Sequence, residues 1–317
     1  MITLKDIAEK LKSKTDIAIF CHIRPDGDTL GSAMALALAL KKMGKVADVF
    51  CAQPVPQKFK LTHPAFNNVE SELKREYDCH IAVDVSDIAL LGDLQRVFLK
   101  NKCTLLVDHH ISNTRFAEFS YVFDLSANCQ NIFALIKVLG VKIDKDMATC
   151  LLTGVVTDTG AFAHKNADEN VLKDCAELVS LGGDLNGIIY QNFKNQPKER
   201  AMLHSITMQK IRYALNDRLG IIVVTKENIS KCGATSDMTE GFIDFVMSID
   251  CVEVGLCLLQ TGEETFKVSF RSKGANVNQM AGVYGGGGHV LASGCMINGP
   301  LEEVIEKLTY TVSQYID

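Results

Sequence analysis

Carboxylate and imidazole side chains follow three apolar segments of the sequence, residues 16–21, 80–83 and 104–107. The side chains that follow these segments are His22, Asp26, Asp28, Asp84, Asp108, His109 and His110. Oxygen ligands with a minority of imidazoles suit hard or borderline divalent cations, so we expect Mn²⁺ or Mg²⁺ rather than zinc, which more often recruits thiolates. The number of ligands fits two ions better than one.

Each motif also has a plainer interpretation when it is considered alone. The sequence from Pro25 to Asp28 is favourable for a turn, and Asp28 could simply cap the next helix. Burial of several like charges at one edge is unfavourable unless cations neutralise them, which favours a shared metal site. Asp158 ends an apolar segment of helical character, where a carboxylate opposes the helix dipole, so we expect it to have a partner there.

The segments that carry these residues predict an α/β fold. From Leu4 to about Gly183, strand-like segments alternate with helical ones, which is typical of βαβ units and a mainly parallel sheet. Such sheets bind ligands at the carboxyl ends of their strands, where the motifs lie. A polar stretch follows, and then a smaller α+β region. We expect a catalytic domain over residues 1–188, a linker over 189–206 and a second domain over 207–317.

The composition is that of a globular protein. The chain has 317 residues, 47% of them hydrophobic, and 33 Lys+Arg against 38 Asp+Glu give a net charge of −5. This excludes a mainly disordered chain and argues against wrapping of long duplex DNA. The longest apolar stretch, Ser32–Leu40, is too short for a membrane span, and no secretory signal is visible at Met1. We expect a cytoplasmic protein that does not contact membranes.

Two further features involve thiols and a glycine run. The 11 cysteines include no C-x-x-C pair, which predicts buried, reduced thiols. The run Gly285–Gly288 could be only a flexible turn. His289 and a stretch of helical character follow the run. The run could therefore also bind an anion through its backbone N–H groups and the imidazole. Arg271 would then be a bidentate phosphate ligand. Arg24 could contact a phosphate or be a solvated loop residue.

In their order along the chain, these motifs resemble those of the DHH phosphoesterase superfamily. The stretches Val268–Lys273 and Tyr284–Gly294 resemble the DHH-associated domain of the same proteins. Together the match spans nearly the whole chain, and it is most similar to the compact bacterial nanoRNase/pAp phosphatase family. The resemblance therefore implies a catalytic domain with two metal ions and a second domain for substrate recognition.

The resemblance also implies a role for each residue. One ion would be bound by His22, Asp26 and Asp84, and the other by Asp28, Asp84, His109 and Asp158. Asp84 would bridge the two ions. Asp108 would orient a histidine, and His110 would contact the scissile phosphate. The residues that would bind the substrate are Arg271, Ser272, Gly286, Gly287, Gly288 and His289.

The implied activity is Mn²⁺-dependent hydrolysis of short single-stranded RNA to 5′-mononucleotides, and of 3′-phosphoadenosine 5′-phosphate (pAp) to AMP, by an activated water. Mg²⁺ or Co²⁺ are substitutes for Mn²⁺, and a homodimer is implied at the family level. The main alternative is a phosphodiesterase for pApA or cyclic di-AMP. An inorganic pyrophosphatase, a RecJ-like exonuclease and a non-catalytic nucleotide-binding regulator are less favoured. The complete ligand set argues against the regulator.

Overall fold

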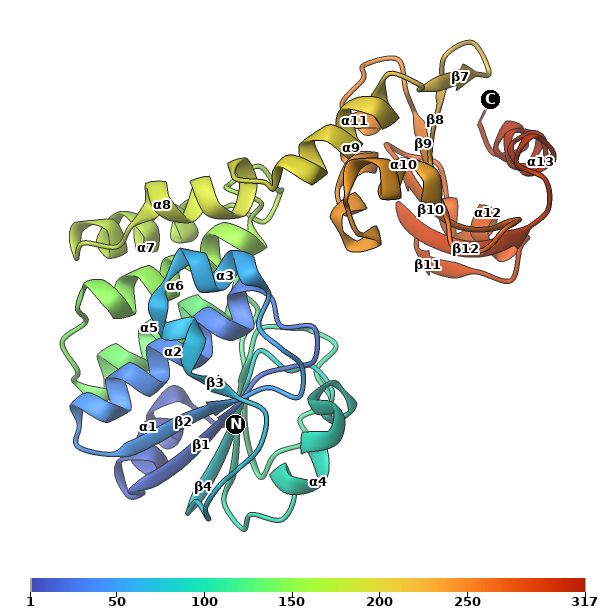
Figure 1. Ribbon diagram of the computed structural model, residues 1–317. Coiled ribbons are helices and arrows are strands. Elements are labelled where there is room, and N and C mark those ends of the chain that lie inside the picture. The colour runs from blue at the N-terminus through green and yellow to red at the C-terminus, as the bar shows by residue number, and fades with distance from the viewer. Residues whose placement is uncertain (1, 317) are drawn as a thin grey trace. The chain divides into compact units, whose positions relative to one another are not determined.

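A computed structural model describes residues 2–316, and it divides into two compact units. The N-terminal unit is Met1–Asn195 and the C-terminal unit is Gln196–Asp317 (Figure 1). The expected linker over residues 189–206 is helical for most of its length, with the π-helix η3 (Tyr190–Lys194) and the first turns of α9 (Lys198–Met208).

The N-terminal unit is built on a six-stranded sheet in which all strand pairs are parallel. The strands are β1 (Asp16–Phe20), β2 (Val46–Phe50), β3 (Val69–Glu70), β4 (Cys79–Val83), β5 (Thr104–Asp108) and β6 (Phe119–Val122). Their order is β3-β2-β1-β4-β5-β6, so the direction of winding reverses between β1 and β4. Ligands of open α/β sheets bind beyond the carboxyl ends of the strands at such a switch point. The prediction of an α/β fold is confirmed.

Helices cover both faces of this sheet (Figure 1). The helices are α1 (Leu4–Lys12), α2 (Gly27–Lys42), α3 (Gln57–Thr62), η1 (Pro64–Asn68), η2 (Ile88–Leu94), α4 (Gln95–Phe98), α5 (Asn128–Leu139), α6 (Lys145–Asp158), α7 (Glu169–Ser180) and α8 (Leu185–Ile189). In β1, Ile17 and Ile19 pack against the core that contains α1, α2, α5 and α6. Ala18 and Phe20 point to the opposite face, toward the core that contains α4.

Helices α2 and α6 pack closely because each has a glycine where the backbone of the other helix approaches. A Cβ on Gly31 would lie 2.4 Å from the Cys150 carbonyl oxygen. A Cβ on Gly154 would lie 2.5 Å from Asp28 Oδ1 and 2.3 Å from Cys129 Sγ. This close packing brings the first turn of α2, which carries Asp28, against the helix that ends at Asp158.

The C-terminal unit has a second six-stranded sheet, in the order β11-β12-β10-β9-β8-β7. All its pairs are antiparallel except β8–β9. The strands are β7 (Arg212–Ala214), β8 (Leu219–Val224), β9 (Val254–Gln260), β10 (Thr265–Ser272), β11 (Gly287–His289) and β12 (Ala292–Asn298). Besides α9, the helices are α10 (Lys226–Cys232), η4 (Ser236–Thr239), α11 (Phe242–Met247), α12 (Val277–Gly282) and α13 (Leu301–Ser313).

One local prediction in this unit is wrong. The residues after Gly288 do not form a helix, because β11 and β12 form a hairpin there. The glycines permit the close approach of its strands, since a Cβ on Gly286 would lie 2.2 Å from the Gly294 carbonyl oxygen and one on Gly288 would lie 2.6 Å from that of Ala292. The helix of this region, α12, precedes the glycine run instead.

The cysteines follow the expectation of buried, reduced thiols, because all are free and all but Cys251 are buried. Among residues 2–316, no helix has both the length and the apolar character that crossing a bilayer requires.

We expect Gly31→Ala to lower the free energy of unfolding by about 1–3 kcal/mol, the usual cost of overpacking a core. Helix propensity alone favours alanine over glycine by about 1 kcal/mol. A net loss of stability would therefore come from the close contact with α6. Chemical denaturation measures the change. Lys41→Ala, at an exposed position of the same helix, is the control and is expected to shift stability by no more than about 0.5 kcal/mol. A stabilised Gly31→Ala variant would contradict this packing argument.

Candidate metal centre

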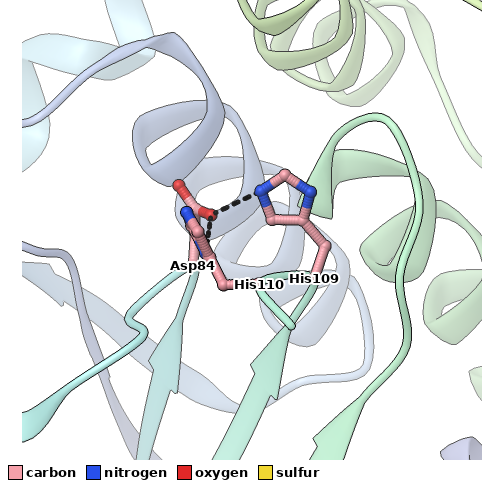
Figure 2. A group of neighbouring side chains, drawn as sticks. All are labelled: Asp84, His109 and His110. Atoms are coloured by element: carbon pink, nitrogen blue, oxygen red, sulfur yellow. Dashed lines mark ion pairs between the residues drawn. The ribbon is translucent and has the colours of Figure 1, made fainter. Parts of the chain in front are cut away.

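The candidate metal ligands of the sequence come together at the carboxyl edge of the N-terminal sheet. His22, Asp26 and Asp28 lie between β1 and the first turn of α2. Asp84 directly follows β4, and His109 directly follows β5. Asp158 is the last residue of α6, and its carboxylate lies near the His109 ring. Figure 2 shows one oxygen of Asp84 joined by ion pairs to both histidines that follow β5.

The side chains form two groups that meet at Asp84. In the first group, His22 Nε2 lies 3.5 Å from Asp26 Oδ2 and 3.6 Å from Asp84 Oδ2. In the second group, His109 Nε2 lies 3.4 Å from Asp84 Oδ1. The same nitrogen is 3.8 Å from Asp28 Oδ2 and 3.8 Å from Asp158 Oδ2. The two oxygens of Asp84 therefore face different histidines and different carboxylates.

Asp84 is held in a strained and poorly satisfied position. Its φ is 59°, in the left-handed region that residues other than glycine rarely adopt, and its N–H donates to the Val107 carbonyl over 3.0 Å. The side chain is 2% exposed, and Oδ1 accepts no hydrogen bond from the described part of the chain. A buried carboxylate oxygen without a donor is costly unless a cation lies against it.

The histidines compensate part of the negative charge. Burial alone would lower the pKa of His22, but the hydrogen bonds and charges of Asp26 and Asp84 outweigh it and raise the pKa to about 11. For His109, burial is likewise outweighed by Asp84 and Asp28, and its pKa rises to about 10. Both imidazoles therefore hold a proton at neutral pH when no cation is bound.

The carboxylates show the same excess of negative charge. Burial and the charges of Asp84 and Asp158 raise the pKa of Asp28 well above its usual range. Burial and the charge of Asp84 raise the pKa of Asp158 to about 6. Burial would also raise the pKa of Asp84, but His109 and His22 outweigh it and lower the value. The site thus contains four carboxylates and two imidazoles that compete for protons. This set of ligand atoms fits two divalent ions such as Mn²⁺ or Mg²⁺.

The amino terminus of α5 holds Asp28 in place. The backbone N–H groups of Asn128 and Cys129 donate to the two carboxylate oxygens of Asp28, over 2.5 and 2.9 Å. Ala127, at the N-cap of α5, offers no side-chain acceptor, so Asp28 supplies the cap from a distant part of the chain. Asn128 Nδ2 also donates to Ser32 Oγ on α2, over 3.2 Å.

A second set of contacts orients His110. The fully buried Asp108 accepts a hydrogen bond from His110 Nδ1 through Oδ1, over 2.9 Å. Its Oδ2 accepts from Asn113 Nδ2, which also donates to the Val85 carbonyl. The hydrogen bond to Asp108 raises the pKa of His110. Because Nδ1 is used in this way, the other ring nitrogen of the half-exposed His110 is free to contact a ligand.

Three asparagines that support the site, Asn113, Asn128 and Asn131, were not predicted from the sequence. Asn131 Nδ2 donates to the Asp108 carbonyl oxygen, over 3.3 Å. For Asn113, the only signal in the sequence is its place three residues after His110. For the two asparagines of α5 there is no signal, because their partners lie in sequence-distant segments.

All the metal-ligand candidates except Asp28 line a cavity of about 410 Å³. Its lining includes His22, Asp84, His109 and His110, together with Arg24. Arg24 has a left-handed φ of 55°, and its N–H donates to Gln53 Oε1 over 2.8 Å. The cavity thus combines acidic side chains and histidines with one arginine.

The structure brings part of the second candidate set together in the C-terminal unit. Arg271 on β10 pairs with Ala292 on β12, which in turn pairs with His289 on β11. Residues directly opposite one another in a sheet share a face, so Arg271 and His289 flank the small Ala292. The half-buried Arg271 donates from Nη1 to the Phe270 carbonyl, over 3.0 Å.

The remaining members of this set make contacts within the chain. Ser272 is buried, and its Oγ accepts from the Gly274 N–H over 2.9 Å. The N–H of Gly286 donates to the Ala281 carbonyl, and that of Gly288 donates to Asn278 Oδ1. These two N–H groups are therefore not free for an anion, in contrast to the expected backbone cradle.

Comparisons with known proteins agree with this architecture. The profile of the DHH family, N-terminal domain, matches residues 16–155, and that of the DHHA1 domain matches residues 220–317. The chain is 30% identical over 314 residues to the bifunctional oligoribonuclease and PAP phosphatase NrnA of Thermus thermophilus. This alignment covers 97% of the chain and 93% of that protein.

Two solved structures share the fold. The crystal structure of an exopolyphosphatase-related protein from Bacteroides fragilis superposes with a TM-score of 0.87 at 24% identity, covering 98% of this chain and 96% of that one. The structure of exonuclease RecJ bound to manganese gives a TM-score of 0.57 at 14% identity, covering 100% and 96%. The family suggested by the sequence motifs is confirmed. The chain belongs to the DHH family of phosphoesterases that carry a DHHA1 domain.

Proposed function

We propose that this phosphoesterase hydrolyses short oligoribonucleotides to 5′-mononucleotides and converts pAp to AMP, with two Mn²⁺ ions. The observation that carries the proposal is the position of Asp84, whose two oxygens face the His22 group and the His109 group. The similarity to an oligoribonuclease and PAP phosphatase over nearly the full length supports the choice of substrates.

The residues divide into two ligand sets. His22, Asp26 and Asp84 would hold one ion, since these three offer ligand atoms that lie close together. Asp28, His109 and Asp158 form a second such group and would hold the other ion together with Asp84. Two bound ions supply an acidified water and neutralise phosphoryl oxygens. Mg²⁺ and Co²⁺ have compatible ligand preferences and are the expected substitutes.

The remaining residues of the site position the substrate. His110, with Nδ1 fixed by Asp108, presents its other ring nitrogen to the scissile phosphate. Arg24 lines the same cavity and adds positive charge for the phosphoryl oxygens. In the C-terminal unit, Arg271 and His289 would bind a phosphate group of a nucleotide. The tight hairpin of Gly286, Gly287 and Gly288 and the buried Ser272 would hold these two side chains in place.

Product analysis by chromatography tests the proposal. Metal-stripped protein is incubated with and without Mn²⁺ against a 5′-phosphorylated diribonucleotide, pAp, cyclic di-AMP, pyrophosphate and a longer single strand. We expect Mn²⁺-dependent release of mononucleotides from the diribonucleotide, and of AMP from pAp. Preferred hydrolysis of cyclic di-AMP or pyrophosphate would contradict the proposed substrates. The absence of phosphate ester hydrolysis for all five would contradict the proposed activity.

We expect Asp84→Asn to lower kcat in the same assay by more than about 100-fold, the upper range for loss of a residue that only supports a metal ligand. Asparagine tolerates the left-handed backbone at this position, so the fold should be retained, and circular dichroism checks it. Asp93→Asn makes the same change at an exposed position of the same unit and should retain full activity. Substantial Mn²⁺-dependent turnover by Asp84→Asn would remove its role as a shared ligand.

We expect Arg271→Ala to raise KM for pAp and the diribonucleotide by about 10- to 100-fold, because a hydrogen bond to a charged group contributes about 1.5–3 kcal/mol. The Mn²⁺ affinity should stay unchanged, since no metal-ligand candidate lies in the C-terminal unit's described residues. Lys267→Ala removes an exposed positive charge from the same strand and is the control. An unchanged KM for Arg271→Ala would argue against a phosphate site on β10.

A further inference from the structure

Two cysteines lie side by side at the amino ends of β4 and β5. Cys79 is the first residue of β4, and Cys103 directly precedes β5. Since His80 pairs with Thr104 in the parallel register, the residues before them are also neighbours. Their sulfur atoms are 3.7 Å apart. Neighbouring strands are about 4.8 Å apart, within the Cα separation of about 4.4–6.8 Å that a disulfide needs.

The backbone holds Cys103 beside Cys79. The N–H of Cys103 donates to Asn101 Oδ1 over 2.9 Å, and its carbonyl accepts from the His80 N–H over 3.0 Å. Both cysteines belong to the core on the face of the sheet that carries α1 and α2. A bond between the two sulfurs therefore requires side-chain rotation and no change of strand register.

The two thiols differ in access. Cys79 is fully buried, whereas Cys103 is 9% exposed and lines a cavity of about 320 Å³. Lysines dominate the charged lining of this cavity. The charged residues there are Lys10, Lys14, Lys102, Asp78 and Glu118. Cys103 therefore borders this cavity, whereas Cys79 is not among the residues that line it.

The surroundings also favour a thiolate on Cys103. The hydrogen bond with Cys79 lowers the pKa of Cys103, burial opposes it, and the charge of Lys14 lowers the pKa further. Glu118 acts in the opposite direction, and Lys10 adds to the effect of Lys14. In contrast, burial raises the pKa of the thiols of Cys129 and Cys150. The thiolate is the reactive form of cysteine.

We propose that Cys103 is a site of oxidation by hydrogen peroxide and that Cys79 resolves the product into a disulfide between β4 and β5. The Cys103 thiolate attacks one peroxide oxygen, the O–O bond breaks, and hydroxide leaves and takes up a proton to form water. Cys103 is then a sulfenic acid. The Cys79 sulfur attacks the Cys103 sulfur, the S–O bond breaks, and the hydroxide takes the Cys79 proton and leaves as water. The pair loses two electrons in total to one peroxide.

This site is independent of the metal centre. Cys79 and Asp84 are separated by the length of β4, which is about 16 Å for five residues at roughly 3.3 Å each. None of the metal-ligand candidates lines the cavity beside Cys103. Thiol oxidation and phosphoester hydrolysis can therefore be measured separately, and failure of one does not imply failure of the other.

Peptide mapping of the full-length protein tests the proposal. Reduced protein is treated with equimolar hydrogen peroxide, the remaining thiols are alkylated, and proteolytic peptides are analysed by mass spectrometry. We expect a cross-linked pair of peptides that contain Cys79 and Cys103, with the loss of two hydrogens and reversal by dithiothreitol. Oxidation elsewhere, with both of these thiols alkylated, would overturn the proposal.

Variants separate the roles of the two thiols. In Cys79→Ser, we expect dimedone to trap a sulfenic acid on Cys103. In Cys103→Ser, we expect Cys79 to remain reduced. Cys251→Ser, which removes the exposed cysteine, should leave the cross-link unchanged. Lys14→Gln should slow formation of the cross-link at neutral pH by at least about three-fold, because it reduces the thiolate fraction. Equal oxidation rates in Lys14→Gln and the unchanged chain would contradict the role of the lysine.

Discussion

The concentration of negative charge around Asp84 is the constraint on which the rest of the N-terminal unit depends. Burial places four carboxylates within reach of two imidazoles, and the carboxylates raise the pKa of His22 to about 11 and that of His109 to about 10, so like charges and protons compete in a small volume. Divalent ions remove this conflict and leave both oxygens of Asp84 with partners. The strained backbone of Asp84 is consistent with a residue whose position is set by ligand binding rather than by local stability.

The fold supplies the means to hold these charges together. Parallel strands place Asp84 and His109 at one edge, and the close packing of α2 and α6 adds Asp28 and Asp158. The amino terminus of α5 then fixes Asp28 through two backbone donors. These four ligands therefore lie in, or directly after, helices and strands that are packed in the core. This rigidity is what a site for two adjacent cations requires.

The sequence was informative where chain order and chemistry coincide. Asp84 follows one predicted strand, and Asp108 and the two histidines follow the next. Because parallel strands end at the same edge of a sheet, this order predicts that these side chains lie together. Asn113 and Asn128 were not predictable, since their contacts arise from segments that meet only in the folded chain. The helix expected after the glycine run was wrong, because a run of glycines carries no strand periodicity that would have indicated the hairpin. The hairpin forms because the backbone of β12 pairs with that of β11 and passes close to Gly286.

Anomalous X-ray diffraction at the manganese absorption edge, from crystals of the full chain grown with Mn²⁺, tests the central claim most directly. We expect two neighbouring anomalous peaks at the carboxyl edge of the N-terminal sheet. One should lie beside His22 and the other beside His109, with one oxygen of Asp84 directed at each. A single peak, or two peaks without Asp84 between them, would contradict the account of Asp84 as the ligand shared by both ions.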